Sequence, residues 1–244
     1  MEKLIITAAI SGAEVLKEHN PAVPYTVEEC VREAKSAYDA GASVIHLHVR
    51  HDDGTPTQDK DRFEEVMTAI QAACPDVIIQ PSTGGAVGMT DDERLQPIEL
   101  NPEMATLDCG TLNFGGDEVF MNTENTIKYF GDRMIERDIK PELEVFDKSM
   151  IDMALRLHKR GHIKSPMHFD FVMGVNGGIS GTLRDFVFLR GSIPEGSTYT
   201  VAGMGRFEMQ LAVAAIIDGG HVRVGFEDNV YLSRGVLAKS NGEL

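Results

Sequence analysis

The alternation of short apolar runs with helix-like segments is the feature that most constrains the fold of this 244-residue chain. Eight runs are predicted as strands: Leu4–Ile10, Ser43–Val49, Val77–Gln80, Met104–Leu107, Glu142–Phe146, Met167–Val172, Thr198–Ala202 and His221–Val224. Seven segments between them are predicted as helices: Thr26–Ala40, Asp59–Ala73, Thr90–Ile98, Thr123–Asp138, Lys148–Arg160, Thr182–Leu189 and Arg206–Asp218. Strict alternation indicates parallel strands with helical crossovers, and eight units favour an α/β fold of the (β/α)8 TIM-barrel type.

The chain length fits one such barrel, which typically has about 250 residues. No linker or repeat divides the sequence, so residues 1–244 are expected to form a single catalytic domain. The residues after His221–Val224 are too few for a full closing helix and tail. We therefore expect the closing C-terminal helix to be missing or truncated, or a partner subunit to cover its place.

Charge and composition exclude several classes of partner. The 38 acidic and 23 basic residues give a net charge of −15, which repels nucleic-acid backbones and anionic membranes. No segment approaches the roughly 20 apolar residues of a membrane span, so a cytoplasmic protein is expected. Cys30, Cys74 and Cys109 are far apart, which indicates buried free thiols rather than disulfides or a thiolate metal site.

Polar side chains follow the two-residue period of the predicted strands. His46 and His48 share one face of the second strand, and Ile45, Leu47 and Val49 share the other. Five further strands carry polar pairs with the same spacing: Gln80 with Ser82, Thr106 with Asp108, Glu142 with Glu144, His168 with Asp170, and His221 with Arg223. Polar groups inside a barrel must bond to each other, a metal or a ligand, so an active site is favoured over a hydrated polar plug.

Two histidines at i and i+2 on one strand can reach a single metal ion. The eighth strand closes against the first, so Glu227 is expected to emerge two strands from His46 and His48, across the small residues Ala8 and Ala9. Two histidines and one carboxylate with open positions fit zinc, and they also fit non-haem iron. Zinc is favoured for chemistry without redox, whereas histidines packed in the core are the structural alternative.

Weaker signals surround this predicted centre. The Ser82–Gly85 segment is either an anion cradle of hydroxyl and backbone N–H groups or a tight glycine turn. Arg223 with Asp228 is consistent with a structural ion pair, and Glu144 with a buried carboxylate paired to Arg223.

Two other classes of function share the predicted donor set. A metal-dependent hydrolase of the amidohydrolase type uses H-x-H at the end of the first strand, whereas the motif lies here on the second. A zinc-stabilised binding or structural subunit would need a fourth protein ligand, because structural zinc sites are closed.

Five blocks carry a family resemblance: VIHLHVR at 44–50, PSTGGAVG at 81–88, MATLDCGTLNFG at 104–115, PELEVFD at 141–147 and GGHVRVGFEDN at 219–229. Together they resemble the β-keto acid cleavage enzymes, from the N-terminus to Leu244. The resemblance implies a zinc-dependent acyl exchange in which a β-keto acid, 3-keto-5-aminohexanoate, and acetyl-CoA give acetoacetate and 3-aminobutyryl-CoA, as in lysine fermentation. It also implies a homotetramer, whereas the residues that bind CoA stay unassigned.

The resemblance also assigns roles to residues. It implies that His46, His48 and Glu227 bind zinc, that Ser82, Gly85 and Thr106 hold the substrate carboxylate, and that Arg223, Asp228 and Glu144 are catalytic. A guanidinium stays protonated, so we predict Arg223 as an electrostatic clamp and Glu144 or Asp228 as the base. The family's substrate selector falls on Glu14, whose carboxylate suits a substrate ammonium group; a solvated loop glutamate is the alternative.

Overall fold

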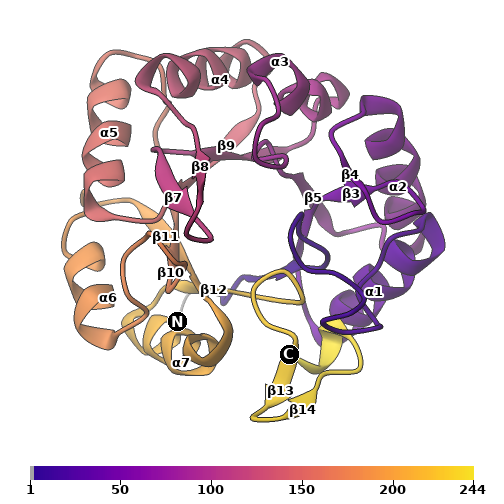
Figure 1. Cartoon of the computed structure of the whole chain (residues 1–244). Helices are drawn as coiled ribbons and strands as arrows, with labels where there is room; N and C mark the ends of the chain where they lie inside the picture. The colour runs from indigo at the N-terminus through magenta and orange to yellow at the C-terminus, as the bar shows by residue number, and fades with distance from the viewer. Residues whose placement is uncertain (1–2) are drawn as a thin grey trace. The chain divides into compact units, whose positions relative to one another are not determined.

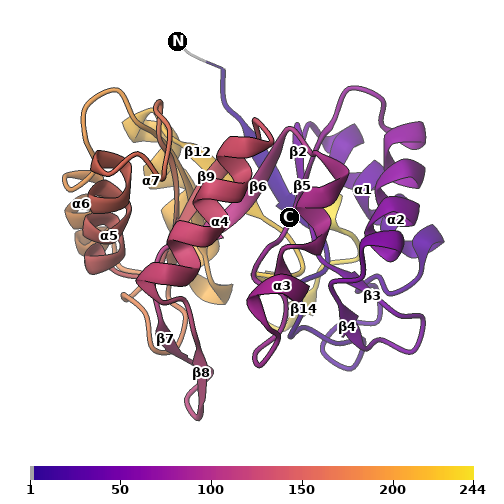
Figure 2. The same ribbon diagram turned by 90° about the horizontal axis from the view of Figure 1, so that it is seen from above.

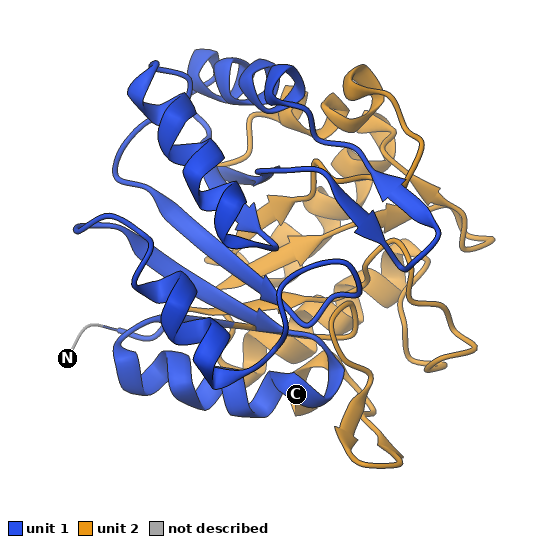
Figure 3. Ribbon diagram, turned by 60° about the vertical axis from the view of Figure 1, so that its left-hand side comes forward, with its two compact units in different colours: residues 1–4, 104–222 blue, residues 5–103, 223–244 orange. Residues whose placement is uncertain are grey.

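The computed structural model describes residues 3–244. The chain forms two compact units (Figure 3). Within the described residues, unit 1 comprises residues 3–4 and 104–222, and unit 2 comprises residues 5–103 and 223–244.

All eight predicted strands are present: β1 (Ile6–Ala9), β2 (Val44–Leu47), β5 (Ile78–Pro81), β6 (Met104–Asp108), β9 (Lys140–Val145), β10 (His168–Met173), β11 (Thr198–Gly203) and β12 (His221–Val224). Their order in the sheet is β5-β2-β1-β12-β11-β10-β9-β6. Helices follow the strands along the chain (Figure 1). This strand order with alternating helices confirms the predicted α/β fold of the TIM-barrel type.

Unit 2 contains the N-terminal strands and their helices. β1 pairs with β2 and β2 with β5, both parallel, and the register places Ala9 beside His46 and His46 beside Gln80. Helices α1 (Val27–Ala40) and α2 (Lys60–Ala73) lie beside these strands (Figure 2). The apolar sides of the strands and helices form one core, which includes Ile45, Leu47, Phe63 and Ile70.

Helix α1 begins and ends where its sequence predicts. Thr26 accepts a hydrogen bond from the Glu29 backbone N–H, and Glu29 accepts one from the Thr26 N–H, which completes a capping box. Gly41 ends the helix at φ 114°, a conformation that residues with a Cβ rarely adopt.

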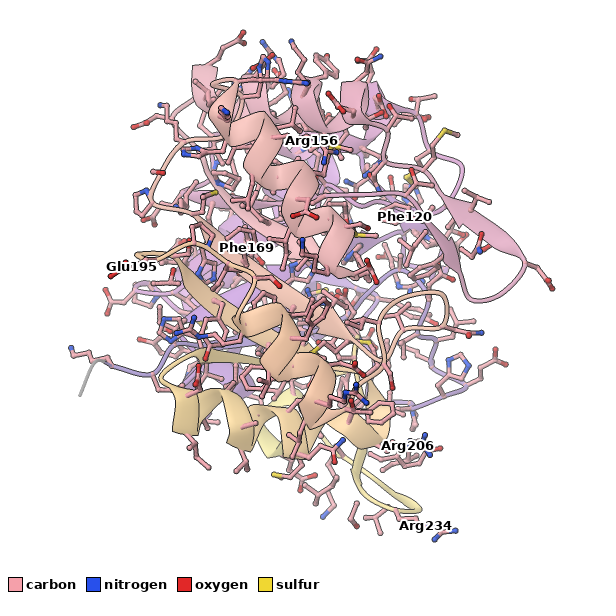
Figure 4. The ribbon with its side chains drawn as sticks, turned by 90° about the vertical axis from the view of Figure 1, so that its left-hand side faces the viewer. Phe120, Arg156, Phe169, Glu195, Arg206 and Arg234 are labelled. Carbon is pink, nitrogen blue, oxygen red and sulfur yellow. The ribbon has the colours of Figure 1, made fainter. Side chains whose placement is uncertain are left out.

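Unit 1 contains the strands β6, β9, β10 and β11, which pair in parallel in that order. Its helices are α4 (Glu124–Glu136), α5 (Lys148–Lys159), α6 (Leu183–Arg190) and α7 (Glu208–Asp218). Phe169 is fully buried on β10, whereas Arg156 is exposed on α5 (Figure 4). The register places Thr106 beside Glu142 and Glu144 beside Asp170.

The structure differs from the predictions at several connections. The helix predicted over Thr90–Ile98 is divided into α3 (Asp91–Arg94) and the 3-10 helix η1 (Gln96–Leu100). Pro97 lacks the N–H that a continuous α-helix would need. Three two-stranded hairpins were not predicted: β3 (Val49–Arg50) with β4 (Pro56–Thr57), β7 (Leu112–Phe114) with β8 (Glu118–Phe120), and β13 (Tyr231–Ser233) with β14 (Val236–Leu237). The 3-10 helices η2 (Gly205–Phe207) and η3 (Asn241–Glu243) complete the described elements.

A buried asparagine, Asn241, connects η3 to three other parts of unit 2. Its Oδ1 accepts a hydrogen bond from the Phe226 N–H at 2.8 Å, and its Nδ2 donates to the Ile10 carbonyl at 3.2 Å. Its backbone N–H and Nδ2 both donate to Glu33 on α1, at 2.9 and 3.1 Å. The C-terminal segment is therefore bonded to the residue before Glu227 and to the end of β1.

The three cysteines are free and buried, as predicted. Over residues 3–244 no helix has the length and apolar character needed to span a membrane.

Candidate metal centre and active site

His46 lies on β2 and His48 directly follows the end of this strand, and both histidines are buried. His46 Nδ1 is 2.9 Å from Gln80 Oε1 on the neighbouring strand β5. Because an amide oxygen accepts only, Nδ1 carries the proton, and the Nε2 atom of His46 is left with a free lone pair. This is the tautomer that binds a metal through Nε2.

Glu227 comes from the turn that follows β12. Its backbone N–H donates to the Ala9 carbonyl at 3.1 Å, which places the turn directly beside β1. Its Oε2 is 3.4 Å from His46 Nε2, and its Oε1 is 3.6 Å from His48 Nε2. The predicted convergence of the three residues across β1 is therefore present in unit 2.

These three residues fit a metal ion on two grounds. His46 Nε2 and Glu227 Oε2 are buried and make no hydrogen bond within residues 3–244. Two ligand atoms about 2.1 Å from a tetrahedral zinc ion lie about 3.4 Å apart, close to both distances here. The donors are imidazole nitrogens and a carboxylate, a set that suits catalytic zinc and other divalent transition metals.

Arg223 links Glu227 to Asp228. Its Nε and Nη2 donate to the two carboxylate oxygens of Asp228, both at 2.9 Å, and Nη2 also donates to Glu227 Oε1 at 2.7 Å. Burial favours the neutral form of Glu227, but the Arg223 guanidinium outweighs it and holds the pKa of Glu227 well below its ordinary value. The predicted ion pair between Arg223 and Asp228 is confirmed.

Asp228 is affected in the opposite direction. Burial raises its pKa above the ordinary value, and the neighbouring Glu227 carboxylate adds to this, against the effect of Arg223. Two adjacent carboxylates therefore differ in basicity: Glu227 is a stable anion, and Asp228 holds a proton more readily.

The segment after β5 forms a tight turn. Ser82 is buried, its N–H donates to the Leu47 carbonyl at 3.0 Å, and its hydroxyl accepts from the Gly84 N–H at 3.0 Å. Gly85 has φ +64°, and a Cβ there would be 2.9 Å from Met89 Sδ. Both predictions for this segment, a glycine turn and a row of backbone N–H groups, are compatible with this geometry.

The loop after β1 lies against the predicted metal ligands. Gly12 has φ +69°, and a Cβ on it would be 2.8 Å from Glu227 Cγ. Ser11 Oγ donates to the His48 carbonyl at 2.8 Å. Glu14 is exposed on this loop, two residues after Gly12.

Arg50 was not assigned a role from the sequence. It is almost fully buried, and it donates to the carbonyls of Gly12, Val15 and Gly54. Arg50 lies two residues after His48, but on the separate short strand β3.

Thr106 and Glu144, two predicted site residues, belong to unit 1. They are buried on the neighbouring strands β6 and β9. Glu144 has ligand atoms within 4.8 Å of those of Glu142 and Asp170, and Glu142 is 3.1 Å from His168. Unit 1 therefore contains a buried carboxylate cluster of its own, and the roles of Thr106 and Glu144 stay predictions.

An α/β-barrel strand order, with two buried histidines and a carboxylate whose ligand atoms converge, defines the class of protein: a barrel protein with a candidate metal site. The family model for the beta-keto acid cleavage enzyme matches residues 3–244. The chain belongs to the β-keto acid cleavage enzyme family.

Known relatives agree with this membership. The chain is 75% identical over 244 residues to the 3-keto-5-aminohexanoate cleavage enzyme of Acetoanaerobium sticklandii, covering 100% of this chain and 89% of the relative. It is 40% identical to the 3-oxoadipate:acetyl-CoA acetyltransferase of Cupriavidus necator, covering 98% of this chain and 85% of the relative. The solved binary complex of ObcA with oxaloacetate has a TM-score of 0.75 at 19% identity, over 91% of this chain and 62% of that one, and supports the fold alone.

Proposed function

We propose that the chain exchanges acyl groups between 3-keto-5-aminohexanoate and acetyl-CoA to give acetoacetate and 3-aminobutyryl-CoA. The observation that carries the proposal is the group of His46, His48 and Glu227, whose ligand atoms converge while two of them lack hydrogen-bond partners. The 75% identity to a cleavage enzyme for this acid, and the acetyl-CoA named for the 40% relative, support the choice of substrates.

Zinc is the metal that we propose for this centre. Held by His46, His48 and Glu227, it would supply Lewis acidity at the keto carbonyl of the substrate. Gln80 fixes the proton of His46 on Nδ1, and Arg223 keeps Glu227 anionic, so both ligands are prepared to bind a cation.

Asp228 is the proposed base. Its pKa is raised towards neutral pH, and its carboxylate is held by Nε and Nη2 of Arg223. It takes a proton from carbon 2 of the β-keto acid. Carbon 2 then forms a bond to the acetyl carbonyl, and CoA leaves as thiolate. The thiolate attacks carbon 3, the bond between carbons 2 and 3 breaks, and Asp228 returns its proton to carbon 2. Atoms and electrons balance without an oxidant or reductant.

Substrate positioning is proposed for four residues. Ser82 and Gly85, with Thr106, would hold the substrate carboxylate, and Glu14 would bind the ammonium group on carbon 5. Glu144 is the alternative base. Its carboxylate is buried beside those of Glu142 and Asp170, and both candidates need a direct test.

The test is a coupled assay with both substrates, with acetoacetate and 3-aminobutyryl-CoA as the measured products. We expect about one zinc per chain by elemental analysis, and we expect His46→Ala and Asp228→Asn to lower turnover by at least about 100-fold. His51→Ala, which changes an exposed loop histidine, is the matched control and should keep its activity. Full activity in a metal-free sample would refute the metal role, and release of an acid from an amide without CoA would support a hydrolase instead.

We also propose that the chain is a cytoplasmic homo-oligomer, a tetramer by family resemblance. An exposed apolar face on α6 and α7 supports association, and it includes Val187, Phe188, Met209 and Ile217. Light scattering after size exclusion measures the mass. A monomeric mass at micromolar concentration would contradict the oligomer.

A further inference from the structure

Arg50 is a buried cation without a carboxylate partner. It lies on the short strand β3, two residues after His48, and is 1% exposed. Within the described residues it makes no ion pair. Instead, its Nη2 donates to the Gly12 and Val15 carbonyls at 3.0 and 2.9 Å, and its Nη1 donates to the Gly54 carbonyl at 2.6 Å.

The surroundings of Arg50 hold it rigidly. Its guanidinium lies over the Tyr25 ring, 5.2 Å from the ring centroid. Gly54, at φ +93°, packs so closely that a Cβ there would be 2.4 Å from Tyr25 Cε2. A buried charge is a costly way to support a loop, because an apolar side chain of similar volume would avoid its desolvation. The charge therefore indicates a requirement other than stability.

Two of the three carbonyls that Arg50 binds are on either side of Glu14. Gly12 precedes Glu14 and packs on Glu227, and Val15 follows it directly. The carboxylates of Glu14 and Glu227 both lie within electrostatic range of the Arg50 guanidinium. Arg50 thereby connects the position of the Glu14 backbone to the segment that directly follows both histidines.

We propose that Arg50 is a positioning residue for substrate specificity, which holds Glu14 at a fixed place relative to His46 and His48. This rests on the proposed function. A β-keto acid with an ammonium group on carbon 5 then reaches Glu14 while its keto carbonyl lies at the histidines. The preference for cationic over neutral β-keto acids depends on this separation, and the chemistry itself does not.

The test compares two substrates that differ only in charge, 3-keto-5-aminohexanoate and 3-ketohexanoate, each with acetyl-CoA. The readout is the ratio of their kcat/KM values in the zinc-loaded enzyme. We expect Glu14→Gln and Arg50→Gln each to lower this ratio by about tenfold or more, and the double variant to fall no further than Glu14→Gln alone. Arg62→Gln is the matched control, since Arg62 donates to the carbonyls of Arg50 and Tyr25 but to none beside Glu14. Its ratio should stay within about twofold of the unchanged enzyme.

Hydrogen exchange of residues 11–17 supplies a readout that does not depend on turnover. Arg50→Gln should increase exchange there, whereas Glu14→Gln and Arg62→Gln should not. Arg50→Lys is the second variant, in case Arg50→Gln does not fold. It keeps the charge but not the fork of two donor nitrogens, so the ratio should fall by less than in Arg50→Gln.

The outcomes separate the two proposals. A wild-type ratio in Arg50→Gln and Arg50→Lys, or losses that multiply in the double variant, would overturn the role of Arg50 alone. Unchanged exchange at residues 11–17 in Arg50→Gln would also overturn it. An unmodified enzyme that turns over neither acid would refute the proposed function and the specificity role with it. Faster exchange in Arg50→Gln would then show that Arg50 supports the loop only.

Discussion

Replacing Gln80 by leucine tests whether its hydrogen bond to His46 prepares that histidine to bind a metal ion. The change removes the oxygen that accepts the His46 Nδ1 proton at 2.9 Å and keeps a side chain of similar size on β5. Without that acceptor the imidazole ring loses both its fixed tautomer and its orientation. We expect the site to remain but to bind metal more weakly.

The expected size of the effect follows from the geometry. Gln80 contacts the ligand and not the metal position, and loss of such an outer partner typically reduces metal affinity by about 10- to 100-fold. That corresponds to about 1.4–2.7 kcal/mol of binding free energy. Gln80→Glu keeps an acceptor at the same place and makes it anionic, so we expect its affinity to equal or exceed that of the glutamine enzyme.

The assay is a competition titration of zinc against a chelator, for the unmodified chain, Gln80→Leu and Gln80→Glu. Gln58→Leu is the control, because Gln58 is also a buried glutamine but donates to the carbonyls of Ser82 and Arg94. Equal affinities for all four proteins would refute the argument. So would a loss in Gln80→Glu as large as in Gln80→Leu.

Two further predictions concern backbone and helix. Gly12→Ala and Gly88→Ala both place a Cβ at positive φ and should each lose about 1–2 kcal/mol of unfolding free energy. Only Gly12→Ala should also weaken zinc binding, because only its Cβ meets Glu227; equal affinities by chelator titration would contradict this. Burial raises the pKa of Glu29, but hydrogen bonds from Lys17 and from the Tyr25 and Thr26 N–H groups outweigh it, and the pKa is lowered. Its stabilisation should be complete above about pH 4.5 and disappear as the pH falls through the lowered value. Urea denaturation of Glu29→Gln should therefore approach the unmodified chain in acid, and a constant difference would contradict the coupling.

The strands were predictable because each carries its own pattern. The two-residue period of His46 and His48 against Ile45 and Leu47 requires no knowledge of neighbours. The short hairpins were missed because strands of two or three residues, such as β3, have too few positions to show a period. The third helix was predicted too long because the effect of Pro97 on local hydrogen bonding was not weighed.

Some site residues could likewise be predicted from the sequence, and others could not. The candidate ligands could be predicted because imidazole and carboxylate groups are common metal donors, and the strand order brings Glu227 to the histidines. The contact between Gln80 and His46 depends on the register between β2 and β5, which sequence does not give. Arg50 was missed because its acceptors are backbone carbonyls, which leave no trace in residue identity.

The hydrogen bonds of Asn241 have a consequence for when the metal centre can form. Two of them join residues that are separated by 208 and by 231 positions in the sequence, and a third holds the turn that precedes Glu227. During synthesis, a chain that has already folded its histidine strand still lacks both the carboxylate and the segment that secures it. The three predicted ligands therefore come together only after Glu227 and Asn241 have been synthesised, and a metal ion bound there would add its binding energy to this late step of folding.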